Sequence, residues 1–123
     1  MLTALRYTGG MTDQAIDFDH LDRYVAGDAA LRDEVLTIFE GQVARCLRLL
    51  DVDGPNEEWR SIAHALKGAS RGIGAWEVGA VCEQAEKLSG TPDDVREARI
   101  ALKQQIQACV ETALVEIKRL RRT

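Results

Sequence analysis

The most constraining feature of the sequence is the stretch from Ser61 to Ala75, SIAHALKGASRGIGA. Read at 3.6 residues per turn, this stretch has two unlike faces, as expected of an amphipathic helix. One face is apolar and is expected to lie against a core, with smaller residues at its edge. This apolar stripe consists of Trp59, Ile62, Leu66, Ala69 and Ile73, edged by Ala63 and Ser70.

The opposite face of the stretch carries His64, Lys67, Gly68 and Arg71, at positions i, i+3, i+4 and i+7. A histidine or lysine on a helix surface is commonly just solvated. Gly68 is harder to dismiss, because a glycine inside a helix costs about 1 kcal/mol relative to alanine. One reason to keep it is close approach by another molecule's backbone beside the imidazole. Together the four residues predict a functional face on this helix.

These residues resemble the signature of the histidine-containing phosphotransfer (HPt) domain, H-x-L-K-G-x-[SA]-x-x-x-G-A. The match runs from His64 through Lys67, Gly68 and Ser70 to Gly74 and the following alanine. It fixes a nucleophile, a cation, two glycines and a helix register together. The resemblance covers about residues 17–90 and includes, outside the signature, Asp17-Phe18, Gly27-Asp28, Phe39, Val81-Cys82 and Glu86.

The resemblance implies a phosphorelay protein of a two-component signal-transduction system. His64 is then expected to carry a phosphoryl group, on its outer nitrogen Nε2, to or from the aspartate of a response-regulator receiver domain. A hybrid histidine kinase is the other expected partner. We expect no independent enzyme, because 123 residues leave no room for an ATP-binding kinase domain. The alternative is a non-catalytic helical adaptor bundle that binds a signalling partner without phosphorylation.

The main requirement of phosphoryl transfer on the chain is an exposed imidazole nitrogen in the neutral form. Lys67 is expected to attract the phosphoryl oxygens and to disfavour the charged ring. No cofactor of its own is expected: without an acidic cluster beside His64, the Mg²⁺ should come from the receiver. The partner-binding residues are expected to be Gly68, Arg71, Arg60 and Ala65.

Three residues are expected to support the site. Glu86 either orients His64, pairs with Lys67 or is only a surface charge. Ser70 is expected to face inward as a packing residue. Gly74 is expected to allow a turn and close helix packing.

Other residues near this face have two interpretations. Arg71 either contacts the phosphoryl group or receiver, or is a solvated charge. Trp76 is either a partner contact or an edge of the core. His20 lies in another helix, without a lysine or glycine on its face, and is interpreted as a solvated surface histidine.

Length and composition describe one ordinary soluble domain, with 123 residues, 46% of them hydrophobic and 29% charged. We expect residues 1–11 to be a flexible leader, with Met11 a possible natural start, and residues 12–123 to form a monomeric HPt-like bundle. A net charge of −4 argues against nucleic acid as the main partner, and no apolar run reaches the ~20 residues of a membrane span. Three cysteines without metal-ligand spacing point to a reducing compartment, the cytoplasm: Cys46, Cys82 and Cys109.

Helical periodicity and helix-end residues predict an all-α fold, an antiparallel up-down four-helix bundle with a short extra N-terminal helix. The short helix is expected over about 18–26, and the long helices over about 29–50, 56–74, 75–89 and 92–120. The expected N-caps are Asp17, Asp28, Asn56 and Thr91. The expected buried stripe of the helix over 29–50 is Leu31, Val35, Ile38, Phe39, Cys46 and Leu49.

Overall fold

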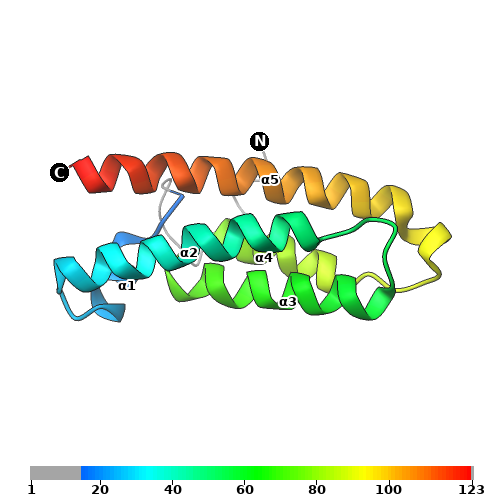
Figure 1. The fold of residues 1–123 in the computed structure, drawn as a ribbon, viewed down its shortest axis with the longest axis horizontal. Helices are drawn as coiled ribbons and strands as arrows, with labels where there is room; N and C mark the ends of the chain where they lie inside the picture. Colours follow the sequence, from blue (N-terminus) through cyan, green and yellow to red (C-terminus); the bar gives the residue numbers. More distant parts are fainter. Residues whose placement is uncertain (1–14, 123) are drawn as a thin grey trace.

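The computed structural model describes residues 15–122, and this part of the chain is all-helical, without strands (Figure 1). The predicted all-α class is confirmed. The predicted leader over 1–11 lies outside the described residues. No helix in the described range is both long and apolar enough to cross a membrane. The five helices are α1 (Phe18–Tyr24), α2 (Ala29–Leu49), α3 (Asn56–Gly72), α4 (Trp76–Glu86) and α5 (Pro92–Arg122).

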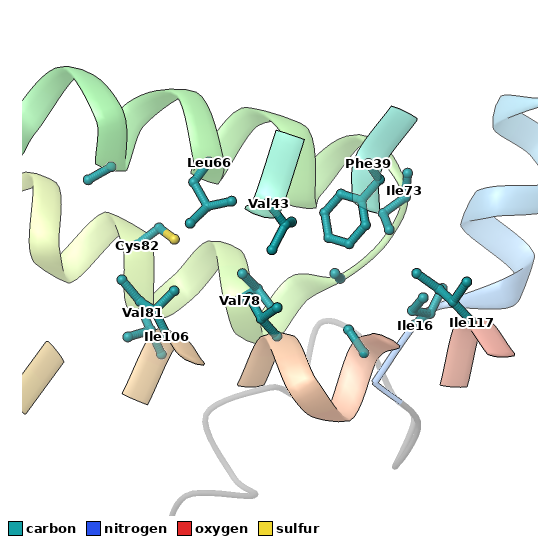
Figure 2. Close-up of a cluster of buried hydrophobic side chains, with 14 of the residues drawn as sticks. Ile16, Phe39, Val43, Leu66, Ile73, Val78, Val81, Cys82, Ile106 and Ile117 are labelled. Carbon is teal, nitrogen blue, oxygen red and sulfur yellow. The ribbon is translucent and has the colours of Figure 1, made fainter. Parts of the chain in front are cut away.

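The four longer helices surround one core. Helix α3 packs against α2 and α4, and α5 packs against the same two helices from the other side. In Figure 1 the colours run from left to right along α2 and from right to left along α5. Figure 2 shows side chains from all four helices meeting in the interior, among them Phe39, Val43, Leu66, Val78 and Ile106. Each fully buried apolar side chain of this kind contributes about 1.5–3 kcal/mol.

Three of the four predicted N-caps are confirmed. The side chains of Asp17, Asp28 and Thr91 each accept a hydrogen bond from a backbone N–H three residues on, over 3.1, 3.0 and 3.2 Å. Asn56 was expected to cap α3, and this was wrong. Pro55 holds the cap position, and the Asn56 side chain instead donates to the Gly90 carbonyl over 2.9 Å.

The predicted buried stripe of α2 was only partly right. Phe39 is buried as expected, but Ile38 is 56% exposed, and Leu31 and Leu49 are also exposed. The buried positions are Leu36, Phe39 and Val43, with Leu50 just beyond the helix end. The sequence of α2 carries two apolar stripes side by side, and the neighbouring helices decide which one is covered.

The other helices differ from the predictions by smaller amounts. In α3, Ala63 and Ser70 lie fully in the core, whereas Ile62 and Ala69 are half-buried. The helix is therefore rotated slightly from the predicted orientation. Helix α4 ends at Glu86, three residues before the predicted end, and α1 ends two residues early.

Gly74 fixes the turn between α3 and α4 against the segment that precedes α1. Its φ of +85° lies in the left-handed region, and a Cβ there would lie 2.9 Å from the Asp17 carbonyl oxygen. The Asp17 N–H donates to the Gly74 carbonyl over 2.9 Å. The turn therefore holds α1 beside the C-terminal end of α3.

Candidate functional site

His64 stands on the outward face of α3. The side chain is 67% exposed, while Ala63 and Leu66 on the same helix are fully buried. The buried residues fix the orientation of α3, so that the imidazole is presented to solvent from a rigid support.

Glu86, the last residue of α4, contacts both His64 and Lys67. Its Oε2 lies 2.7 Å from His64 Nδ1, and its Oε1 lies 2.7 Å from Lys67 Nζ. The Lys67 ammonium, and after it the His64 ring, hold the pKa of the Glu86 carboxyl below its usual range. An ionised carboxylate accepts from Nδ1–H, so the geometry favours the tautomer with an unprotonated Nε2.

Lys67 was expected on the exposed face of α3, but its side chain is not exposed as that of His64 is. Its side chain is only 18% exposed and is ion-paired with Glu86. The sequence placed Lys67 correctly on the outward half of α3. It did not reveal that the end of α4 covers that side of the helix.

Gly68, Arg60 and Ala65 are all exposed on the same helix. A Cβ added at Gly68 would meet no atom within 4 Å. No packing inside the described structure therefore requires a glycine here, and its effect is to keep the surface beside His64 low.

Arg71 crosses from α3 to α4 and pairs with Glu83, which also lies 2.9 Å from Lys87. The Arg71 side chain packs over Gly79, where a Cβ would lie 3.0 Å from Arg71 Cγ. Hydrogen bonds from Lys87 and Arg71 lower the pKa of Glu83 to about 2. Arg71 is thus half-exposed and held by Glu83, and among the described interactions no hydrogen bond or ion pair joins it to His64.

Ser70 lies inside the bundle, not on the histidine face. It is fully buried, and its Oγ donates to the Leu66 carbonyl over 2.7 Å. A hydroxyl in this position is satisfied within its own helix and packs in the core, as expected. Gly74 lies in the turn beyond the C-terminal end of α3.

His20 is not the solvated surface histidine that was expected. The ring is partly buried, and its Nε2 lies 3.1 Å from the Gly72 carbonyl, to which it donates. The ring packs edge-on against Trp76, with centroids 4.7 Å apart. Trp76, which is half-buried, in turn donates to Asp17 Oδ2 over 3.0 Å, so its indole is held by the segment that precedes α1. His20 therefore connects α1 to the end of α3.

A partly apolar groove of about 170 Å³ lies beside Gly68, between α2 and α3. It was not predicted, because Ile38 was assigned to the core. Tyr24 and Ile38, both exposed, lie on its walls. Its complete lining is Tyr24, Val35, Ile38, Phe39, Gln42, Gly68, Ala69, Gly72 and Ile73.

Within residues 15–122, no group of three or more acidic, histidine or cysteine side chains is arranged to hold a metal ion. The cysteines in this range are free; Cys82 is buried, while Cys46 and Cys109 are half-buried. Burial raises the pKa of Cys82 to about 12 and that of Cys109 to about 11. These thiols therefore stay protonated near neutral pH and are poor nucleophiles and metal ligands.

Comparison with known proteins gives two matches. Residues 31–119 match the sequence model of the Hpt domain family. The crystal structure of the histidine phosphotransferase ShpA from Caulobacter crescentus is 38% identical, with a TM-score of 0.54 over 84% of this chain and 98% of that chain. No curated protein matches the sequence.

Proposed function

Because this chain belongs to the Hpt domain family, whose members are phosphotransfer intermediates and not kinases, we propose that its phosphoryl carrier is His64. The phosphoryl group passes between His64 and the aspartate of a response-regulator receiver domain, or reaches His64 from a hybrid histidine kinase. The observation that carries the proposal is the exposed ring whose Nδ1 is engaged by Glu86.

The transfer step needs an unprotonated nitrogen and a positioned phosphorus atom. The Nε2 lone pair of His64 attacks the phosphorus of the receiver's aspartyl phosphate. The N–P bond forms as the P–O bond breaks, and the aspartate carboxylate leaves with the bonding electron pair. The proton stays on Nδ1, where Glu86 accepts its hydrogen bond. The Mg²⁺ that neutralises the phosphoryl oxygens belongs to the receiver in this proposal.

The proposed receiver-binding surface is the outward face of α3 together with the groove beside it. Gly68 belongs to both, since it lies one turn from His64 and lines the groove. Arg60, Ala65 and Arg71 form the rest of the α3 contribution. The exposed Ile38 in the groove supports docking of an apolar segment of the receiver.

Further proposals concern the molecule as a whole. We propose that residues 12–123 form one monomeric domain and that α2 to α5 make an antiparallel up-down bundle. The contacts of α3 and α5 with α2 and α4 support the bundle. The free cysteines support a reducing compartment, for which we propose the cytoplasm.

The experiment that tests the function is a transfer screen. Receiver domains from the same organism are purified, loaded with labelled phosphate in the presence of Mg²⁺, and mixed with the full chain. At least one receiver should pass label to the chain, in an acid-labile and base-stable form. If no receiver transfers label to the chain, the phosphotransfer proposal is wrong. If a receiver binds the chain without transferring label, the adaptor alternative replaces it.

A further inference from the structure

Two glycines keep the groove between α2 and α3 open. Gly68 and Gly72 lie one turn apart on its α3 side, and a Cβ added at either would meet nothing within 4 Å. Packing among the described residues therefore requires neither glycine, although glycine destabilises a helix relative to alanine. Because Gly68 also lies one turn from His64, a partner that reaches His64 from this side covers the groove as well.

The apolar part of the groove has the size of one large side chain. Phe39 and Ile73 line it and are buried, and the exposed Ile38 adds apolar surface at its wall. The groove has a volume of about 170 Å³, and a cavity of about 150 Å³ takes a benzene ring. One aromatic or branched aliphatic side chain of a partner therefore fills it.

Two polar side chains also line the groove, Tyr24 of α1 and Gln42 of α2. Both are exposed, and none of the described hydrogen bonds involves the Tyr24 hydroxyl or the Gln42 amide. Buried neighbours fix both positions: Leu21 and Val25 beside Tyr24, and Val43 beside Gln42. The two polar groups are therefore held on rigid supports and can bind a partner.

A partner that covers the groove removes water from these two groups. A polar group that loses water without gaining a hydrogen bond weakens binding, whereas a group that gains a matched partner does not. A site built to hydrogen-bond its partner consequently rejects a partner without the complementary group far more strongly than an apolar pocket rejects a small change of shape. Polar groups in an apolar groove thus act mainly on selectivity.

We propose that Tyr24 and Gln42 determine which receiver domains the protein binds. The receiver that fits places one aromatic or branched aliphatic side chain in the groove and carries hydrogen-bonding groups beside it. A receiver with only apolar side chains there binds weakly, because it leaves the Tyr24 hydroxyl and the Gln42 amide unpaired. Both residues act on docking and not on the transfer step. The inference rests on the proposed function in taking a receiver domain as the partner.

Binding of unphosphorylated receiver domains tests the inference without a transfer step. Calorimetry with the full chain and the purified receivers of the same organism gives a Kd for each receiver. Tyr24→Phe and Gln42→Leu remove one polar group each and keep the apolar surface. Each change should weaken binding of the tightest receiver about tenfold and leave the other receivers unchanged or bound more tightly. Gln104→Leu, the same change at an exposed glutamine of α5, should leave every Kd unaltered.

Transfer kinetics give a second readout. For the tightest receiver, KM should rise about tenfold in Tyr24→Phe and Gln42→Leu, while kcat keeps its wild-type value. Phosphoramidate is the control donor, because it needs no docking surface. Its phosphorus forms a bond to Nε2 of His64 as the bond to its own nitrogen breaks and ammonia leaves. Labelling by phosphoramidate should proceed at the same rate in the wild type and in both variants.

The inference is overturned if Tyr24→Phe and Gln42→Leu bind the receivers with the same order and ratio of Kd values as the wild type. A fall in kcat with an unchanged KM would also overturn it. Receivers that bind the wild type selectively but pass it no label would instead contradict the proposed function. Loss of that selectivity in the two variants would then leave the inference standing.

Discussion

At the residue scale, two exposed glycines allow the effect of a glycine on helix stability to be distinguished from its effect on partner docking. Gly41 in α2 and Gly68 in α3 are both exposed, and a Cβ at either would meet nothing within 4 Å. Each lowers helix stability by about 1 kcal/mol relative to alanine. Only Gly68 lies one turn from His64, so a comparison of the two glycines separates the docking role proposed for Gly68 from an effect on helix stability.

Gly68→Gln should slow phosphoryl transfer by at least about tenfold, because its side chain would stand where the receiver's backbone approaches the ring. Gly41→Gln is the matched control and should transfer at the wild-type rate. Both variants should unfold at slightly higher urea concentration than the wild type, since glutamine is the better helix former. Equal transfer rates in the two folded variants would show that Gly68 is not an access device.

The residues of the face could be predicted from helical spacing, but their mutual contacts could not. His64, Lys67 and Gly68 share the outward half of α3 because they are spaced three and four apart. For Glu86 the sequence left three alternatives open. Two hold at once, because the packing of α4 on α3 brings one carboxylate within 2.7 Å of both partners. Such a contact depends on the end of α4, which the sequence placed three residues too far on.

At the scale of elements, α5 holds the loop between α2 and α3 through a buried arginine. Arg99 is 1% exposed and donates to the carbonyls of Val52 and Gly54 over 2.9 and 2.8 Å, and to Asn56 Oδ1 over 2.6 Å. Its guanidinium also lies over the Trp59 ring, 4.9 Å from the centroid. This network was not predicted, since an arginine in a long amphipathic helix usually lies at the surface.

Arg99→Met should destabilise the fold by about 2–4 kcal/mol, because one buried and two half-buried acceptors lose their donor. Urea unfolding followed by circular dichroism measures this change. Arg96→Met is the control: Arg96 pairs with Asp53 at the exposed surface, so its loss should lower stability far less than the loss of Arg99. If the two variants unfold at the same urea concentration, the buried network does not stabilise the loop.

The ion pairs around Glu83, between α3 and α4, make the stability of the fold depend on pH. Lys87 and Arg71 lower the pKa of Glu83 from its usual 4.5 to about 2, so the folded state favours the ionised carboxylate. This contribution is fully present above pH 4.5 and is lost as the pH falls towards about 2. The stability of the wild type should therefore fall with acid across that window, and Glu83→Gln should fall less steeply. Parallel stability curves would contradict this role of the α3–α4 ion pairs.

The fold class was predictable because capping residues near each helix end determine where the helix begins. Which face of a helix is buried depends instead on the neighbouring helices. Asp17, Asp28 and Thr91 cap their helices as expected. The two apolar stripes of α2 are equally periodic in sequence, and only the positions of α3 and α5 decide which one is buried. Ile38, which was wrongly assigned to the core, is consequently exposed and lines the groove beside Gly68.

At the scale of the whole molecule, the bundle exposes one histidine, while other potential phosphoryl acceptors are buried or hydrogen-bonded. His20 Nε2 is occupied by the Gly72 carbonyl, Ser70 is buried, and two cysteines keep their protons through raised pKa values. His64 alone among the described histidines has an exposed ring with Nδ1 held by a carboxylate. A single acceptor nitrogen, Nε2 of His64, therefore carries the proposed transfer.

The direct test is to incubate variants of this chain with a phosphorylated receiver and Mg²⁺ and to measure the label they acquire. The wild type and His20→Gln should both acquire acid-labile, base-stable phosphate, and His64→Gln should acquire none while keeping its helical circular dichroism spectrum. In the wild type, ³¹P–¹⁵N NMR should place the phosphorus on Nε2 of His64. Undiminished labelling of His64→Gln, or phosphorus on Nδ1, would contradict the account.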